Sequence, residues 1–282
     1  MFADAVSAES LRFLRNRSTV FWSVLFVPIA SLVISTISVL VMRANTQDMA
    51  ELVAQLGAGG APVDLGELLP SLAVGLANPA MLLFLTIGAA TLYAGDYRWE
   101  TWRLITGRNT RLNLMAGKIA VLAVTTLVAM LVMLAMSIIN EIIKAAVFDR
   151  PLAFTVDGDI AGQFLGLFGL SWLRMMQFTM IALMMAVLTR SLLAALFTPL
   201  ALGAAQAIGA PMFLGMGLTP DGWTTLLLLP GAAFDAIVAV IQQEMGAPTE
   251  ALPKALLGLA LWTAVPLGLA LWLFNRQDLS KE

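Results

Sequence analysis

Long apolar runs constrain this chain more than any other feature. A helix needs about 20 apolar residues to cross the hydrocarbon core of a bilayer. Six stretches are long enough, at about 19–42, 72–94, 117–139, 168–189, 191–210 and 255–274. Across all 282 residues, 60% are hydrophobic and 12% are charged, whereas soluble domains are about half apolar and a quarter charged. We therefore expect an all-α polytopic membrane protein, with residues 1–282 forming a single transmembrane domain.

The segment before the last apolar run allows two interpretations. Residues 223–241 are apolar, but they contain Pro230-Gly231 and Asp235, and a charge at the middle of a bilayer is costly. We favour a helical or re-entrant segment on the outer side over residues 211–254. A seventh span is the alternative.

Basic residues predict the orientation, because cytoplasmic loops carry an excess of Lys and Arg. If the N-terminus and the C-terminus both lie inside, eleven basic residues fall on the inner side and five on the outer side. The inner set is Arg12, Arg15, Arg17, Arg98, Arg103, Arg108, Arg111, Lys118, Arg190, Arg276 and Lys281. We therefore predict a multi-pass protein of the cytoplasmic (inner) membrane.

The N-terminal segment 2–17 combines apolar and basic side chains. Phe2, Leu11 and Leu14 suggest an apolar stripe, and Arg12 and Arg15 can reach lipid headgroups. This pattern favours an amphipathic helix along the inner leaflet. A frayed basic tail is the alternative.

Composition excludes several classes of chemistry. The chain has no Cys and no His, so disulfides, catalytic thiols, imidazole bases and histidine-metal sites are ruled out. No GxxxxGK[ST] phosphate loop is present, and the net charge of −2 does not indicate a nucleic-acid partner. We expect no catalytic residue, metal or cofactor in this chain.

The most polar stretch lies between the second and third apolar runs. It reads GDYRWETWRLITGRNTRLNLMAGK over residues 95–118. Its tryptophans and arginines suit a docking surface for a partner. The alternative is that they are ordinary positive-inside and aromatic-belt residues.

The order of residues in this stretch resembles the cytosolic loop of permease subunits in the type-2 ABC exporter family. In that family an acid, a Gly-Thr pair, a leucine-rich turn, an arginine and a lysine follow one another. Asp96, Thr101, Arg111 and Lys118 stand at matching positions, whereas Glu100 replaces the usual glycine. The resemblance extends over nearly the whole chain, from the amphipathic N-terminal segment to the ending FNRQDL at 274–279.

The resemblance implies a mechanism. Residues 95–116 would form a coupling helix seated on a separate ATPase subunit, and the N-terminal helix would be the elbow. Two ATPase copies would bind ATP and Mg, and a second permease chain, like or unlike, would complete the membrane part. The implied coupling residues are Asp96, Arg98, Glu100, Thr101, Trp102, Arg103 and Arg111.

The resemblance also places a substrate path along the second and fifth spans. Its implied lining residues are Asn78, Thr86, Thr91, Thr198 and Gln206. An apolar wall with scattered neutral polar groups suits a lipid, an amphipathic peptide or a hydrophobic drug. The alternative is that these side chains hydrogen-bond within and between helices.

Arg174 also allows two interpretations. If the fourth span begins near Trp172, Arg174 reaches the outer headgroups, which we favour. If the span begins at Phe164, Arg174 lies inside and needs a partner such as Glu141 or Asp235.

Two other functions compete with the exporter subunit. A transporter or channel driven by an ion gradient usually buries charged relays in its spans, and the six predicted cores contain no acid. A membrane enzyme would need clustered acids, and the close outer pair Asp157 and Asp159 is explained by a polar turn.

Overall fold

The computed structural model describes residues 2–45, 62–99, 101–102, 106–107 and 109–278. Within these ranges, six helices are long and apolar enough to cross a membrane: Arg17–Ala44, Pro79–Arg98, Arg111–Val147, Gly158–Thr189, Leu192–Gly215 and Thr249–Arg276. The predicted all-α character is confirmed, and so is the presence of six helices that could span a membrane.

The described residues form the following elements, in chain order. They are α1 (Phe2–Arg15), α2 (Arg17–Val20), the π-helical turn η1 (Phe21–Leu25), α3 (Phe26–Ala44), β1 (Val63–Asp64), α5 (Leu65–Gly75), α6 (Pro79–Arg98), α8 (Arg111–Val147), β2 (Leu152–Ala153), α9 (Gly158–Thr189), α10 (Leu192–Gly215), α11 (Trp223–Leu228), α12 (Pro230–Ile241), the 3-10 turn η2 (Thr249–Ala251) and α13 (Leu252–Arg276).

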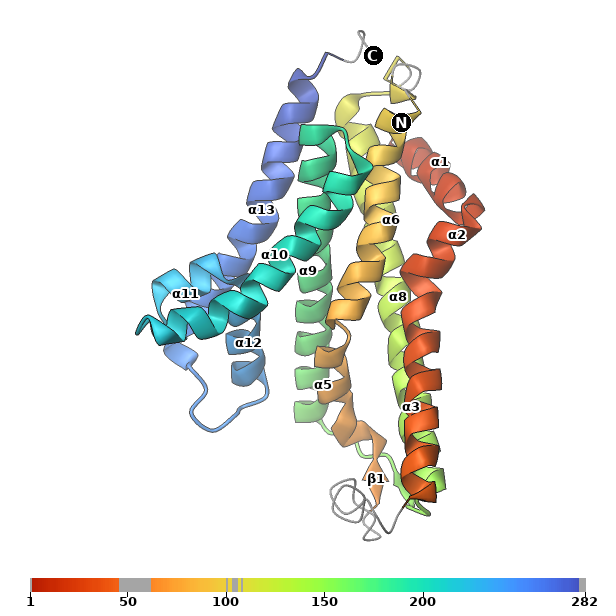
Figure 1. The fold of residues 1–282 in the computed structure, drawn as a ribbon, viewed down its shortest axis with the longest axis vertical. Helices are drawn as coiled ribbons and strands as arrows, with labels where there is room; N and C mark the ends of the chain where they lie inside the picture. Colours follow the sequence, from red (N-terminus) through yellow and green to blue (C-terminus); the bar gives the residue numbers. More distant parts are fainter. Residues whose placement is uncertain (1, 46–61, 100, 103–105, 108, 279–282) are drawn as a thin grey trace.

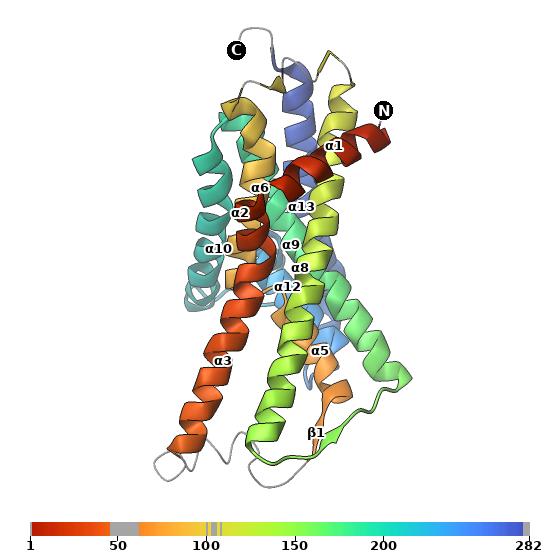
Figure 2. The same ribbon diagram turned by 90° about the vertical axis from the view of Figure 1, so that its right-hand side faces the viewer.

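Helices α6 and α9 form the centre of the bundle (Figure 1). Helix α3 packs on α8 on one side, and α10 and α13 pack on α9 on the other. Figure 2 shows α1 crossing α8 obliquely. The start of α1, the ends of α6 and α13, the start of α8 and the α9–α10 turn lie at the same end of the bundle.

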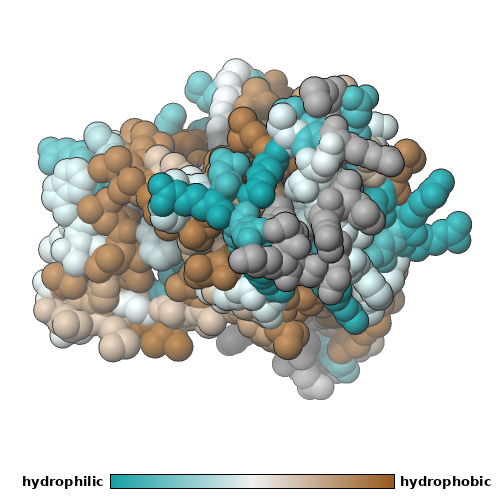
Figure 3. All heavy atoms as spheres, turned by 90° about the horizontal axis from the view of Figure 1, so that it is seen from above, coloured by the Kyte–Doolittle hydropathy of each residue, from teal (hydrophilic) through white to brown (hydrophobic). Residues whose placement is uncertain are grey.

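We call this end the basic end, because it carries Arg12, Arg15, Arg98, Arg111, Arg190 and Arg276 on its helix termini. Figure 3 looks down on this end and shows several groups of hydrophilic residues on it, with hydrophobic residues between them. The basic residues that the sequence assigns to one side therefore also lie together in space, as far as the structure describes them.

The second span begins later than predicted. The apolar run at 72–94 is broken at Leu76–Asn78, and α5 ends before α6 begins. Asn78 Oδ1 accepts a hydrogen bond from Met81 N at 2.9 Å, and Pro79 takes the first position of α6. An Asn cap followed by proline is a strong helix start, so local capping overrides the continuous hydropathy.

Helices α8 and α9 are longer than the predicted spans 117–139 and 168–189. Helix α8 has 37 residues, which is about 55 Å at 1.5 Å per residue and exceeds the roughly 30 Å of a bilayer core. Helix α9 begins at Gly158, where Asp157 Oδ1 accepts from Ile160 N at 2.8 Å. It ends at Arg190, whose φ of 54° is left-handed, a conformation that terminates helices.

The segment 211–254 contains two short helices, α11 and α12. Helices α11 and α12 have 6 and 12 residues, too few to cross a bilayer at 1.5 Å per residue. They are separate because Pro230 starts α12 and Leu229 has a non-helical ψ of 86°. Gly258 of α13 permits close packing here, since a Cβ on it would lie 2.3 Å from the Leu226 carbonyl oxygen.

Helix α1 packs closely on the first third of α8. Ala5 and Phe13 are buried, whereas Leu11 and Leu14 are exposed, so the apolar residues lie on more than one face of α1. Gly117 permits the approach, because a Cβ on it would stand 3.0 Å from the Ala5 Cβ.

The opposite end of the bundle carries a two-stranded parallel pair, in which Val63 aligns with Leu152 and Asp64 with Ala153. Asp64 Oδ1 accepts hydrogen bonds from Gly66 N and Thr155 N, each at 2.9 Å. Hydrogen bonds from Thr155 hold the pKa of this carboxyl below its usual value. One side chain thus caps α5 and joins it to the segment before α9.

Candidate functional site

A buried cluster of charges lies at the basic end, where α1, α6 and α8 meet. Lys118 of α8 is fully buried, and its Nζ lies 2.6 Å from Asp96 Oδ2 and 2.9 Å from Glu9 Oε1. It also donates a hydrogen bond to the Leu92 carbonyl at 3.1 Å. A single ammonium group on α8 therefore contacts two other helices, α1 and α6, and joins all three.

Asp96 is the second centre of the cluster. Its Oδ1 accepts hydrogen bonds from Arg12 of α1 and from the Thr101 hydroxyl. Thr101 N also donates to the Asp96 carbonyl at 3.0 Å, so the chain after α6 folds back on its own last turn. We name Glu9, Arg12, Asp96, Lys118 and Thr101 the charge cluster.

The cluster contains two acids and two bases, so its formal charge is zero. Asp96 and Lys118 are 0% exposed, and Glu9 is 5% exposed. Charges this deep are tolerated when they are paired, and removal of one partner leaves the other uncompensated. The pairing therefore fixes the relative positions of α1, α6 and α8.

Trp102 lies inside the chain and not on its surface. Its side chain is 0% exposed, its ring centroid is 4.6 Å from that of Phe274 and 5.6 Å from that of Tyr97, and Lys118 Nζ lies 5.3 Å from it. In this structure the indole is a packing element under the cluster, which leaves no surface for a partner to contact.

Arg111 attaches the start of α8 to the end of α13. Its Nη1 donates to the carbonyls of Phe274 at 2.8 Å and Gln277 at 2.7 Å. The last carbonyls of a helix lack intrahelical partners and attract cations. Gln277 adds bonds to Tyr97 Oη and to the Val187 carbonyl, so α6, α8, α9 and α13 are joined at this end.

Arg98 is the exposed member of the predicted coupling set among the described residues, and Trp99, which is not in that set, is exposed beside it. The Trp99 side chain is 68% exposed, and the Arg98 guanidinium lies 5.4 Å from its ring centroid. Glu100 and Arg103, also predicted to contact a partner, lie outside the described residues. An aromatic ring and a cation therefore stand on the surface directly above the buried cluster.

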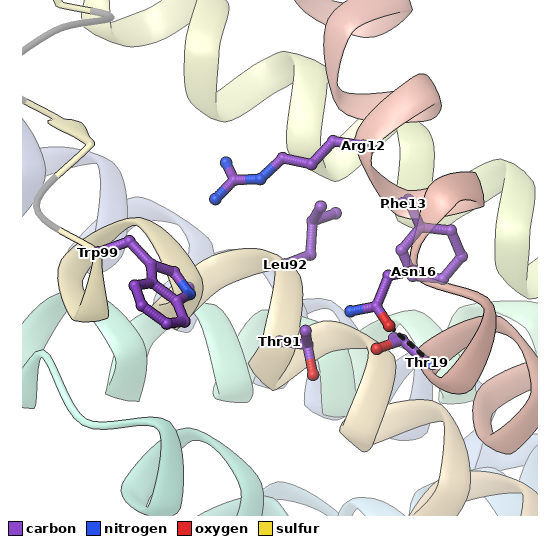
Figure 4. A pocket seen from close by; sticks show the side chains of 8 residues that line it. Arg12, Phe13, Asn16, Thr19, Thr91, Leu92 and Trp99 are labelled. Atoms are coloured by element: carbon purple, nitrogen blue, oxygen red, sulfur yellow. Dashed lines mark hydrogen bonds between the residues drawn. The ribbon is translucent and has the colours of Figure 1, made fainter.

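A cavity of about 120 Å³ lies beside the cluster, between α1, α2 and α6. Figure 4 shows Arg12 reaching from α1 across α6, with Trp99 on the far side and Asn16, Thr19 and Thr91 below. Polar groups thus continue from the cluster into an opening at the basic end.

Most predicted path residues bond within their own helix. Thr86 and Thr91 donate to the carbonyls of Leu83 and Ile87, at 2.6 and 2.7 Å, and Asn78 caps α6. Thr198 is half-buried in α10. Gln206 alone of these five lines a large groove between α6, α9, α10 and α12, with a volume of about 760 Å³.

Arg174 reaches the same groove. It stands near the middle of α9 and is 8% exposed. The structure therefore buries Arg174 among helices, whereas we favoured a position at the outer headgroups. Its Nη1 donates to Gln177 Oε1 at 2.6 Å and its Nη2 to Gln206 Oε1 at 2.8 Å. Asp235, one of the two alternative partners, lines the same groove.

The contacts of Glu9 and Arg12 with Asp96 and Lys118 were not predicted from the sequence. The available signals were a lysine inside an apolar run and an acid inside an amphipathic helix, each an expensive placement that requires a partner. Among the described residues no group of three or more acids could hold a metal ion. Comparison with models of protein families, with curated proteins and with solved structures found no match.

Proposed function

We propose that this chain is the transmembrane subunit of an ATP-binding-cassette exporter and that its basic end faces the cytoplasm. A separate ATPase, present in two copies, docks at that end and supplies ATP and Mg chemistry. A second permease chain completes the membrane part. The substrate is hydrophobic or amphipathic and moves out of the cytoplasm or the inner leaflet.

The charge cluster is the observation that supports this proposal. It lies beneath the segment that follows α6 and connects that segment to α1 and α8 through Asp96 and Lys118. If this segment made few contacts, a displacement by the ATPase would move the segment alone. With the charge cluster beneath it, the same displacement would move α1, α6 and α8 together, because buried ion pairs resist separation in a low dielectric.

The exposed pair Arg98 and Trp99 is suited to receive that push. Aromatic and arginine side chains contribute most strongly to protein interfaces. The orientation follows from the gathering of basic residues at this end, since short cytoplasmic loops are rich in Lys and Arg. Residues 95–116 would then be the coupling segment and α1 the elbow.

The test is to purify the tagged chain from its own membranes and to identify a co-purifying chain with a phosphate loop. ATP hydrolysis by the reconstituted pair is then measured. Replacing Trp99 by Ala, together with Arg98→Glu, is expected to abolish the dependence of hydrolysis on this chain. Unchanged coupling in that variant would refute the docking site.

A matched control is available away from the basic end, where α11 and α13 begin. Trp223 is 53% exposed and has Lys254 Nζ 5.7 Å from its ring centroid. The same two changes there, Trp223→Ala with Lys254→Glu, remove an equivalent surface pair and are expected to leave ATP hydrolysis unchanged.

One observation favours a second candidate, a transporter driven by an ion gradient. Arg174 and Asp235 carry opposite charges on two walls of one groove, and charged residues inside membrane proteins often mark ion pathways. Transport by the chain alone in liposomes with a pH or sodium gradient would support this candidate, and transport that requires ATP and a partner would exclude it.

A further inference from the structure

The groove between α6, α9, α10 and α12 carries two opposite charges on apolar walls. Its volume of about 760 Å³ lies in the range of about 300–1,000 Å³ typical of small-molecule sites. Leu82, Leu83, Phe178, Leu200 and Phe234 contribute apolar surface. Arg174, Gln206 and Asp235 contribute the polar groups.

The cation is fixed in position before any ligand arrives. Arg174 is held by the side-chain oxygens of Gln177 and Gln206, and its guanidinium lies 5.0 Å from the Phe178 ring centroid. Gln206 Oε1 also accepts from Gly231 N at 3.1 Å, which ties the start of α12 to this assembly. Because both of these partners are neutral, they do not neutralise the positive charge of Arg174, and the guanidinium can still attract an anion.

The anion on the other wall has no direct partner. Asp235 is exposed toward the groove, and within the described residues its carboxylate has no hydrogen bond and no cation within 4 Å. Arg174 lines the same groove from α9. A carboxylate beside apolar walls favours an added cation, because the alternative is an uncompensated charge.

These positions match a ligand with both charges. An anionic group alone would pair with Arg174 but would be repelled by Asp235. A cationic group alone would pair with Asp235 but would be repelled by Arg174. A zwitterionic head satisfies both walls, with its anion at Arg174 and its ammonium at Asp235. The apolar part of the ligand then lies along Leu82, Leu83 and Leu200.

The bilayer is the source that the surroundings favour. Helix α10 forms one wall of the groove, and its outer surface is apolar and exposed at Leu193, Phe197, Ile208, Met212 and Leu214. A ligand that is already in the membrane reaches the groove along this surface without crossing water. We propose that the groove binds the head of a zwitterionic phospholipid, phosphate at Arg174 and ammonium at Asp235.

The binding site stands whether or not an ATPase drives the chain, whereas export of this lipid rests on the proposed function. The purified full chain is titrated in detergent with dioctanoyl phosphatidylethanolamine and followed by native mass spectrometry. Dioctanoyl phosphatidylglycerol, which lacks the ammonium, and a dioctanoyl trimethylammonium lipid, which lacks the phosphate, are the comparators. The zwitterion is expected to bind about fivefold more tightly than either, which is the upper end of the effect of one partly exposed ion pair.

The Asp235→Asn variant is expected to lose that preference, binding the zwitterion about fivefold more weakly and the anionic lipid no more weakly than wild type. Asp221→Asn, an exposed acid outside the groove, should match wild type. Equal binding of the three lipids by wild type would overturn the proposal. So would an Asp235→Asn variant that binds normally but falls from dimer to monomer, because a second copy would then occupy the groove.

Discussion

Replacing Lys118 by Met tests the charge cluster most severely. Methionine keeps the length of the side chain and removes the ammonium, so Asp96 and Glu9 lose the cation 2.6 and 2.9 Å away. Breaking a buried pair by removing one partner costs about 3–5 kcal/mol. We expect that loss in the free energy of unfolding, and lower protection of α1 from hydrogen exchange.

The same helix provides the control. Lys144 pairs with Glu141 at 2.7 Å, but the two side chains are 31% and 18% exposed. Replacing Lys144 by Met is expected to cost at most about 1 kcal/mol, as for exposed pairs.

The assay is equilibrium unfolding in mixed micelles, with each variant compared with wild type under the same conditions. A second change, Asp96→Asn in the Lys118→Met background, should recover part of the loss, because it removes the uncompensated charge. A loss at Lys118 no larger than at Lys144, with no recovery in the double variant, would refute the reasoning.

Three further predictions concern packing and capping. Gly117→Val is expected to cost about 1–3 kcal/mol by overpacking against Ala5, whereas Gly169→Val, where a Cβ meets nothing within 4 Å, should not lower the midpoint of thermal unfolding comparably. Arg111→Ala should raise hydrogen exchange over residues 271–278, because three carbonyl bonds at the end of α13 are lost; unchanged exchange would contradict this. The pKa of Asp64 is lower in the folded state than in the unfolded state, so the ionised carboxylate stabilises the fold. This contribution is fully present above the unfolded-state pKa of about 3.9 and is lost as the pH falls through the lower folded-state pKa. Asp64→Asn should therefore abolish the acid-induced loss of amide protection at the start of α5, and persistence of that loss would refute the assignment.

The six spans could be predicted because length and hydropathy alone decide whether a helix can cross a bilayer. Their limits could not, because capping decides them. Asn78 and Pro79 interrupt an apolar run that looks continuous, and Asp157 starts α9 ten residues before the predicted span. Hydropathy averages over a window, whereas a cap is a property of one or two residues.

The partners of charged residues were harder to predict than the spans. Lys118 and Glu9 are 109 positions apart in sequence, and only the packing of α1 on α8 brings them together. Tryptophan is a residue type that often forms contacts between proteins, but Trp102 packs against Phe274 of the last helix. Arg174 is accommodated inside because Gln206 from another helix supplies an oxygen.

The orientation of the basic end tests the whole account, since an ATPase can dock only from the cytoplasm. The chain has no cysteine, so single cysteines at Trp99 and at the exposed Phe154 near the opposite end can be labelled separately. With a membrane-impermeant maleimide, we predict that intact cells label the cysteine at 154 and that inverted vesicles label the cysteine at 99. Labelling of position 99 from outside intact cells would contradict the account.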